Sequence, residues 1–368
     1  MKKLECSDHI REISIEERLY YARLSRDKAL NLSAEEKRRY FYSIQVKHRN
    51  LLTVEKEISR YISGDTDTRI LTLIGPPGAG KTSLILNVLA NRLKATEMGQ
   101  IPFVSVSTPA HGSNKVPWSE MYRKILRAGR EPLIDQKRVT DMTGETVKVR
   151  SNSMGSLSAL RDAVMSMLIN RKTKILALDE VLHMLRFGNH EALMDTFKSL
   201  ADETSCQILL IGSYDLFGLA TTYGQVARRE EIFYLGRYGH NVDEKGNSDK
   251  EADARDVEEY RNIIRKLQDK WPLEDVPQFA NLASDLLLMT LGIVGLLKEF
   301  MTQCLVLQME NDGKWDNDFV RRAMKKPYVI KKIRKEVESG EKEMRNEGFF
   351  NDGAPVFAEA IRVIRRTA

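Results

Sequence analysis

The chain has 368 residues, enough for two or three compact domains, and its 42% hydrophobic and 30% charged residues exclude a disordered protein. It has no run of about 18 apolar residues, no apolar N-terminal signal segment and three widely spaced cysteines, so we expect a cytoplasmic protein without membrane contact. The net charge is +6, and Arg321–Ala368, with 13 basic and 7 acidic residues, carries that whole surplus.

Residues 1–45 are polar and helix-prone, with acidic and basic residues mixed. Ser33 and Glu36 have the spacing of a capping box that opens a helix. The cluster Arg38–Tyr42 is basic and aromatic, and we favour a helix face packed on the next domain over a contact with a partner or nucleic acid. We interpret residues 1–45 as a helical extension that contacts a partner protein.

Strand and helix patterns alternate from residue 69 to about residue 237, which predicts a parallel sheet covered by helices. Two short runs within Arg138–Arg150, separated by Thr143-Gly144-Glu145, predict a β-hairpin. Residues 46–240 are therefore expected to form an α/β core with a five-stranded parallel sheet. The expected strands are Arg69–Ile74, Ile101–Ser107, Lys174–Leu178, Gln207–Ile211 and Glu231–Leu235.

A polar loop over residues 238–256 precedes a segment dense in leucine and methionine, which predicts a small all-helical lid domain over residues 241–312. Residues 313–368 then form a basic tail, in which Arg321–Lys335 holds eight basic residues and no acid. Such a tail suits DNA or an acidic partner surface, and a solvated helix is the plain alternative.

Residues 75–82 fit the pattern G-x-x-x-x-G-K-[ST] at every position, between an expected strand and an expected helix over Thr82–Leu93. The glycines allow backbone N–H groups to point at phosphate oxygens, and the helix directs its positive end there. Lys81 would reach the β- and γ-phosphates of ATP, and the Thr82 hydroxyl would bind Mg²⁺. The residues expected to bind ATP here are Gly75, Pro76, Pro77, Gly78, Ala79, Gly80, Lys81, Thr82 and Ser83.

An apolar strand that ends in two acids supplies the second half of this site. Asp179 would hold Mg²⁺ through its water shell, and Glu180 would orient and deprotonate the attacking water. Adjacent carboxylates at a strand end are costly unless a cation is near, which favours a functional interpretation. The following strand ends at Ser213, which we expect to contact the γ-phosphate or the attacking water; a simple turn residue is nearly as good an interpretation.

Arg228 and Arg229 precede the last expected strand. An arginine there can reach the γ-phosphate bound to a neighbouring subunit and offset charge in the transition state. The alternative is a surface ion pair with Glu230 or Glu231.

The order of P-loop, acidic strand end, hydroxyl-ended strand, arginine pair and helical lid resembles that of AAA+ ATPases. The succession over residues 178–235 resembles the TniB/TnsC branch, the ATP-dependent regulators of DNA transposition related to MuB. The resemblance is best over residues 45–237. It implies a protein of the bacterial cytoplasm that forms a ring or helical filament on duplex DNA and links a target-selection protein to transposase subunits. It also implies slow ATP hydrolysis coupled to assembly or disassembly. Because the chain ends of this family serve partner proteins, we favour docking of the basic tail, residues 313–368, to transposase components.

The same resemblance implies roles for individual residues. Arg229, with Arg228 beside it, would act across the subunit interface. Lys115, in the loop after the second strand, and then Arg138 and Thr140 would contact DNA phosphates, although solvated loop side chains are an equal alternative. Many lids of this class carry an arginine that touches the nucleotide; this chain has Gly292-Ile293-Val294-Gly295 there, so Lys298 is the candidate substitute.

Two other functions fit the sequence. A helicase loader or replication initiator belongs to a neighbouring AAA+ branch, but no clear DNA-reading domain follows residue 312. An ATP-dependent switch that ignores DNA is the second. Glu180 and Arg229 favour turnover across an interface, but a slow switch could keep both.

Overall fold

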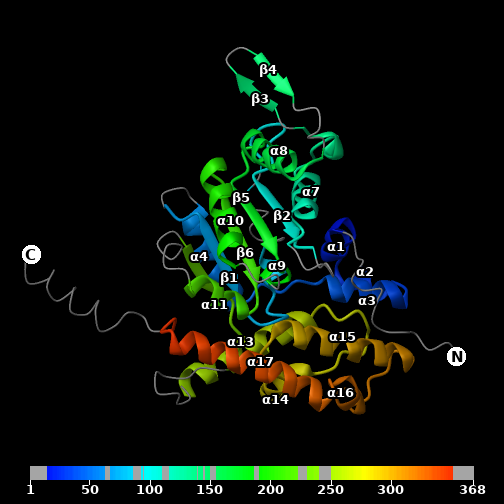
Figure 1. Cartoon of the computed structure of the whole chain (residues 1–368). Helices are drawn as coiled ribbons and strands as arrows, with labels where there is room; N and C mark the ends of the chain where they lie inside the picture. The colour runs from blue at the N-terminus through cyan, green and yellow to red at the C-terminus, as the bar shows by residue number, and fades with distance from the viewer. Residues whose placement is uncertain are drawn as a thin grey trace, which may run out of the picture. The chain divides into compact units, whose positions relative to one another are not determined.

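The computed structural model describes residues 15–62, 67–85, 93, 95–109, 116–138, 140–143, 146–149, 155–185, 190–222, 230–239 and 250–350. The chain divides into two compact units. An α/β unit spans Arg49–Gly236, and a helical unit combines residues 1–48 with residues 237–368. Figure 1 shows the elements of both units along the chain.

A five-stranded parallel sheet forms the centre of the α/β unit, with strand order β2-β5-β6-β1-β7. Strands β1, β5 and β6 are buried almost throughout, as expected for a parallel sheet covered on both faces. All five strands lie where the sequence predicts them, within two residues at each end. Their bounds are Ile70–Ile74 (β1), Phe103–Ser107 (β2), Ile175–Asp179 (β5), Gln207–Gly212 (β6) and Glu230–Tyr234 (β7).

Helices cover both faces of this sheet. Alternate strand residues such as Leu71 and Leu73 share one apolar cluster with Leu51, Val54 and Ile58 of helix α4. Helices α10 and α11 contact β1 and β6. The helices of the unit are α4 (Arg49–Ile62), α5 (Lys81–Leu84), α7 (Trp118–Ala128), α8 (Leu157–Asn170), α9 (Leu182–Leu185), α10 (His190–Thr204) and α11 (Asp215–Thr222), with a 3-10 turn η3 (Ile134–Gln136).

The predicted hairpin is also present. Strands β3 (Thr140–Thr143) and β4 (Thr146–Val149) pair antiparallel, with Thr140 opposite Val149. The helix expected after the P-loop is described from Lys81 to Leu84, and most of its remaining predicted length lies outside the described residues.

The helical unit takes its elements from both ends of the chain. Helix α3 begins at the predicted capping box, because the Ser33 side chain accepts from the Glu36 N–H while the Glu36 carboxylate accepts from the Ser33 N–H. The elements are α1 (Ile15–Ala22), α2 (Arg26–Leu30), α3 (Ala34–Ser43), α13 (Lys250–Gln268), η5 (Phe279–Leu282), α14 (Ala283–Met289), α15 (Val294–Glu310), α16 (Asp318–Ala323) and α17 (Pro327–Asn346).

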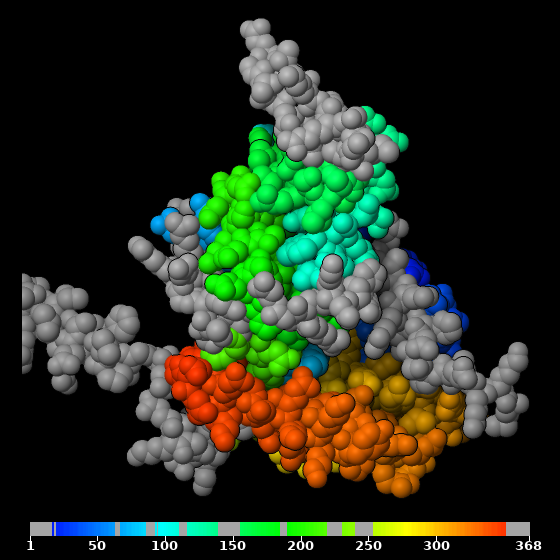
Figure 2. Space-filling view, viewed as in Figure 1, coloured from blue at the N-terminus to red at the C-terminus, as the bar shows by residue number. Residues whose placement is uncertain are grey.

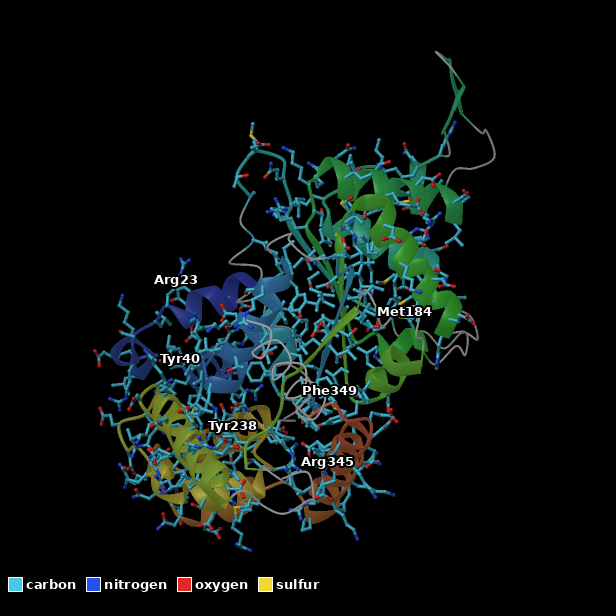
Figure 3. The ribbon with its side chains drawn as sticks, turned by 90° about the vertical axis from the view of Figure 1, so that its left-hand side faces the viewer. Arg23, Tyr40, Met184, Tyr238, Arg345 and Phe349 are labelled. Carbon is cyan, nitrogen blue, oxygen red and sulfur yellow. The ribbon has the colours of Figure 1, made fainter. Side chains whose placement is uncertain are left out.

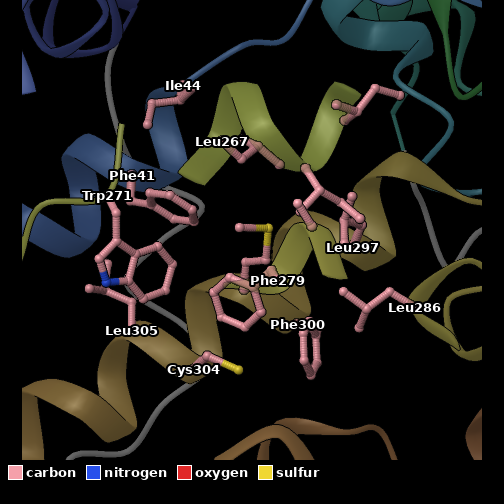
Figure 4. Packing of buried hydrophobic residues seen from close by; sticks show 14 of the residues in the cluster. Phe41, Ile44, Leu267, Trp271, Phe279, Leu286, Leu297, Phe300, Cys304 and Leu305 are labelled. Atoms are coloured by element: carbon pink, nitrogen blue, oxygen red, sulfur yellow. The ribbon is translucent and has the colours of Figure 1, made fainter. Parts of the chain in front are cut away.

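One core joins these segments (Figure 4). Phe41 of α3 packs edge-on against Trp271, with ring centroids 5.0 Å apart, and Trp271 packs in turn on Phe279. The Trp271 indole N–H donates to Gln308 Oε1 over 3.0 Å, so its polar atom is satisfied inside the core. Tyr40 and Tyr238, both marked in Figure 3, are fully buried in this unit.

The helical unit differs from the expected domain order. Residues 1–45, the lid and the basic tail were expected as three separate regions, whereas the first 48 residues and residues 237–368 form one unit. Arg38, Tyr40 and Phe41 are buried in α3, so the basic and aromatic cluster packs within its own unit. The reason is that each short segment has an apolar face too small to be stable alone.

In each unit, a polar contact joins the two chain segments next to the points where the chain passes from one unit to the other. In the α/β unit, the Asn50 amide donates to the Gly236 carbonyl oxygen over 3.1 Å. In the helical unit, His48 Nδ1 lies 3.0 Å from the Tyr238 hydroxyl. Within the described ranges, no helix has both the length and the apolar composition that a membrane crossing needs.

Candidate nucleotide-binding site

The carboxyl ends of four parallel strands lie at one edge of the sheet and bring together the predicted site residues that follow β1, β5 and β6. Ile74, the last residue of β1, is level with Gly212 of β6, and Ser107 of β2 is level with Asp179 of β5. The P-loop begins at Gly75, directly after β1. Open α/β sheets bind ligands at this edge.

The P-loop needs glycine at specific positions. A Cβ atom at residue 75 would lie 2.4 Å from the backbone oxygen of Leu235, so only glycine fits against that neighbouring segment. Gly78 and Gly80 have φ angles of 81° and 102°, which residues with a Cβ rarely adopt. Helix α5 starts at Lys81, directly after Gly80. The local conformation therefore matches the loop that the sequence motif predicts.

Lys81 turns its ammonium group back over this loop. Its Nζ atom donates to the carbonyl oxygens of Gly75 and Pro76, at 2.7 and 3.0 Å. The side chain is half-buried, while Pro77 and Gly78 at the tip of the loop are exposed. The positive charge is thus held at the mouth of the loop, where an anion would approach.

Thr82 and Asp179 come from opposite halves of the motif and meet directly. The Thr82 hydroxyl donates to Asp179 Oδ2 over 2.8 Å. A hydroxyl and a carboxylate are oxygen donors of the kind that Mg²⁺ prefers, and this ion commonly takes one or two protein ligands together with water and phosphate oxygens. The pair therefore fits Mg²⁺, for which Thr82 would be a direct ligand with Asp179 beside it.

Glu180 adopts a left-handed backbone conformation at the end of β5, with a φ angle of 57°. Two hydrogen bonds hold this conformation: its N–H donates to Asp179 Oδ1 over 2.9 Å, and its carbonyl accepts from the Thr108 hydroxyl over 2.5 Å. Such strain costs on the order of 1 kcal/mol and is found often at functional sites. The side chain remains 63% exposed, so water can reach its carboxylate.

Four side chains around Glu180 and β2 were not predicted as site residues. The Ser107 hydroxyl donates to Glu180 Oε2 over 3.4 Å, and His183 Nε2 lies 3.5 Å from the same oxygen. Lys124 Nζ donates to the Ser107 carbonyl over 3.2 Å, which places a cation beside the strand end. Thr108 is the fourth, through the hydrogen bond from its hydroxyl to the Glu180 carbonyl oxygen. Polar residues directly after β2 were the available signal, because parallel strand ends share one edge.

Ser213 follows β6 at the same edge and is half-buried. Its carbonyl accepts from the Leu216 N–H over 3.1 Å near the start of α11. The neighbouring chain segment is tied to the Glu180 turn, because the Val181 N–H donates to the Ile211 carbonyl. This places Ser213 on the same sheet edge as Asp179 and Glu180.

Lys298 has a different set of partners within the helical unit. Its ammonium donates to the carbonyl oxygens of Tyr42 and Ile44, and lies 5.2 Å from the centre of the Tyr42 ring. A cation at the C-terminal end of helix α3 satisfies carbonyls that the helix leaves without internal partners. The nucleotide contact expected for Lys298 stays a prediction.

The remaining predicted residues are only partly described. Arg228, Arg229 and Lys115 lie outside the described residues. Arg138 is exposed, directly before the hairpin, and Thr140 is the first residue of β3. The DNA contacts expected for them stay predictions.

Comparisons with known proteins agree with this architecture. Residues 65–219 match the family model described as an AAA domain. The Orc1 protein of Aeropyrum pernix, solved in complex with DNA, is similar in structure over 81% of this chain and 68% of its own, with a TM-score of 0.51 and 13% identity. The α/β unit has the AAA+ P-loop fold. Further helices follow this fold in the chain, from α13 to α17, and the role of a lid stays a prediction for them.

Two further matches are weaker. Domain III of the Thermotoga maritima replication initiation protein DnaA covers 76% of this chain and 92% of its own, with a TM-score of 0.43 and 14% identity. The zinc import ATP-binding protein ZnuC of Marinobacter nauticus is 29% identical over 153 residues, or 40% of this chain. The chain matches 58% of the length of that relative.

Proposed function

We propose that this protein is an ATP-dependent AAA+ regulator of DNA transposition. It assembles on duplex DNA, hydrolyses ATP slowly and links a target-selection protein to transposase subunits. The observation that carries the ATP-dependent part is the 2.8 Å contact between the Thr82 hydroxyl and Asp179 Oδ2, with Glu180 next in the chain. The transposition part rests on the resemblance of residues 178–235 to the TniB/TnsC branch.

Each site residue has a proposed role in binding or hydrolysing ATP. The P-loop N–H groups and Lys81 bind the phosphates, while Thr82 and Asp179 hold Mg²⁺, which neutralises charge on the phosphate oxygens when bound. Glu180 orients the attacking water and accepts its proton. Ser107 and His183 position the Glu180 carboxylate through the contacts at 3.4 and 3.5 Å. Ser213 contacts the γ-phosphate or that water.

The sheet register supports a site shared between protomers. Ile70, the first residue of β1, is level with Glu230, the first residue of β7. The chain therefore enters β7 at the sheet edge opposite the P-loop, about 15 Å away at roughly 3.3 Å per residue. Arg229 directly precedes β7, so we propose that it acts on ATP bound to a neighbouring protomer, with Arg228 beside it.

Duplex DNA is the proposed scaffold for assembly. Contacts from Lys115, Arg138 and Thr140 would go to phosphates, so binding would tolerate any sequence and weaken steeply with salt. The Orc1 structure with the same fold is a complex with DNA. That precedent makes DNA a reasonable ligand to test here.

The test is electron microscopy of the full chain with random duplex DNA and a slowly hydrolysed ATP analogue. We expect rings or helical filaments with the parent and with Lys270→Ala, an exposed control in the helical unit. Lys81→Ala should lose assembly by losing nucleotide, whereas Arg229→Ala should bind nucleotide but assemble poorly. Equal assembly of all four proteins, with or without nucleotide, would refute the proposal.

A replication initiator or helicase loader is the second candidate, favoured by the structural similarity to Orc1. A loader would require its helicase for a DNA-dependent activity, and an initiator would prefer particular sequences. Assembly on any duplex, followed by stimulation of a transposase encoded beside this protein, would favour the transposition role. A switch independent of DNA would show nucleotide binding with no response to duplex.

A further inference from the structure

A groove with an apolar floor and a basic rim lies on the helical unit, with a volume of about 1040 Å³. We call it the basic-rimmed groove. Its floor includes Leu288 and Met289 at the end of α14, Met324, and Pro327 and Ile330 on α17. Its rim includes Lys325, Lys331, Arg334, Lys335 and Lys342. The surface of α16 and α17 is drawn in orange to red in Figure 2.

The floor presents two neighbouring apolar side chains to solvent. Leu288 is 67% exposed and Met289 is 38% exposed, side by side. Contiguous exposed apolar side chains bordered by polar ones mark interaction sites. Methionine suits such a surface, because its flexible side chain adapts to varied partners.

The shape of the groove fits an elongated occupant. Its α17 lining recurs every three or four residues from Pro327 to Lys342, which is one face of the helix. At about 1.5 Å per residue, this face runs for roughly 22 Å, the length of a four-turn helix. A helix lying in an apolar groove is a recurrent mode of peptide recognition.

The charge of the rim selects the partner. Lys331, Arg334 and Lys335 are exposed, and within the described part of the chain they have no ion-pair partner. Glu338 is the one acidic residue that lines the groove. The fifth rim cation, Lys325, pairs with Glu299. The other four cations around an apolar floor complement an amphipathic helix that carries apolar residues on one face and carboxylates beside them.

The other occupants fit less well. DNA has no apolar surface for Leu288 and Met289, and its interfaces are strongly polar. Residues 351–368 of this chain carry three arginines against Asp352 and Glu359, so they share the sign of the rim. A second copy docked through the same face would oppose like charges.

We propose that the basic-rimmed groove binds an acidic amphipathic helix of a partner protein. This inference does not depend on the proposed role in transposition, because it rests on the helical unit alone. Apolar contacts with the floor supply affinity, and the rim supplies selectivity and a fast approach.

The experiment uses the full chain without nucleotide or DNA. The probe is a fluorescein-labelled designed helix of about 18 residues, with a leucine stripe flanked by glutamates, and its counterpart has lysine at each glutamate. Fluorescence anisotropy measures both affinities. We expect the acidic peptide to bind at least about tenfold more tightly, with an advantage that shrinks as salt rises.

Variants locate the binding site. Arg334→Glu with Lys335→Glu should weaken binding of the acidic peptide at least about tenfold. The matched control, Lys270→Glu with Lys314→Glu, reverses two exposed cations outside the groove and should leave affinity unchanged. Leu288→Ser should weaken both peptides, since it removes floor contacts, and thermal unfolding verifies that each variant is folded.

Several results would overturn the proposal. Equal loss of affinity in both charge-reversed proteins would indicate unspecific attraction. A requirement to delete residues 351–368 before peptide binds would make that segment the occupant. Displacement of the peptide by duplex DNA, with Leu288→Ser leaving the peptide affinity unchanged, would assign the surface to DNA.

Discussion

Glu180 combines three properties in one residue: a left-handed backbone, an exposed carboxylate and two polar neighbours on that carboxylate. The backbone conformation is fixed by hydrogen bonds to its own N–H and carbonyl, so the side chain has no part in maintaining it. A change of the side chain can therefore test chemistry without disturbing the turn. This separation makes Glu180 the most informative single position in the site.

We expect Glu180→Gln to lower ATP hydrolysis by about 10²- to 10⁴-fold, because it removes the proposed general base. Nucleotide affinity should stay within about twofold, since none of the phosphate or Mg²⁺ contacts involves this carboxylate. Single-turnover phosphate release and titration with a fluorescent nucleotide measure the two quantities. Glu191→Gln, an exposed acid on α10, is the control. Retention of full hydrolysis would remove Glu180 from the mechanism.

Glu230 is the other unusual acid of the α/β unit. It accepts a hydrogen bond from the buried Thr72 hydroxyl over 2.6 Å, while its Oε2 is buried without a hydrogen-bond partner among the described residues. Burial raises the pKa of Glu230 above its ordinary value near 4.5, and the Thr72 hydrogen bond and Lys198 only partly oppose this. The folded protein therefore keeps the proton on Glu230 to a higher pH than the unfolded chain does.

The sign of the effect on stability follows. Protonated Glu230 contributes its full amount to the free energy of unfolding at pH values below the pKa that this carboxyl has in the unfolded chain. That contribution is lost as pH rises through the higher pKa that Glu230 has in the folded protein. The parent should lose up to about 1.4 kcal/mol per pH unit within that window. Glu230→Gln cannot ionise, so its free energy of unfolding should gain on the parent as pH rises from about 4.5 towards 7. Urea unfolding at several pH values measures this, and a constant difference would contradict it.

At the scale of elements, a buried ion pair helps to fix α17 to the rest of its unit, beside the buried side chains of Val337 and Met344. Arg237 Nε and Nη2 each donate to a carboxylate oxygen of Glu341 at 2.8 Å, with the two side chains only 9% and 5% exposed. Arg237 follows directly on the α/β unit in the chain, and Glu341 lies more than a hundred residues later. The pair ties the start of the second chain segment to its last described helix.

Glu341→Ala should lower the free energy of unfolding by about 3–5 kcal/mol, because it removes the carboxylate that offsets the buried Arg237 charge. Glu336→Ala, an exposed acid on the same helix, should have almost no effect. Replacing both Arg237 and Glu341 by methionine should recover most of the loss. Chemical denaturation of the four proteins gives the comparison, and equal stability of the two alanine variants would refute it.

Elements that depend on local patterns could be predicted from the sequence, whereas contacts between distant segments could not. The strands and the P-loop are local patterns, since strands buried on both faces read as apolar runs and the loop geometry demands its glycines. The Thr82–Asp179 contact also follows from the sequence, because the P-loop that leads to Thr82 starts at the carboxyl end of β1 and Asp179 is the carboxyl end of β5, another parallel strand. The sequence does not predict that both ends of the chain form the helical unit. Its contacts join residues more than 200 positions apart, such as Phe41 with Trp271 and Lys298 with Tyr42. Apolar residues at helical spacing indicate a buried face but not which distant segment covers it.

At the scale of the whole molecule, the proposed DNA contacts predict how binding depends on salt. Lys115→Ala and Arg138→Ala should each reduce the slope of log K against log salt by about 0.9, because each removes one phosphate contact. The loss should be the same for unrelated duplex sequences. Fluorescence anisotropy with labelled duplexes in the presence of an ATP analogue measures the slope, with Lys270→Ala as the control. Unchanged slopes would exclude these two residues as phosphate contacts.

The way in which the chain passes between the two units also affects the order in which they can fold during synthesis. Since Asn50 and Gly236 are hydrogen-bonded, the ends of the α/β unit meet, and that unit is complete once the ribosome has delivered residue 236. The N-terminal helices α1–α3 must then wait, with Tyr40 and Phe41 uncovered, until α13 and α15 emerge. During synthesis the nascent chain thus exposes an aromatic surface early, and a holding chaperone would be most useful in that interval.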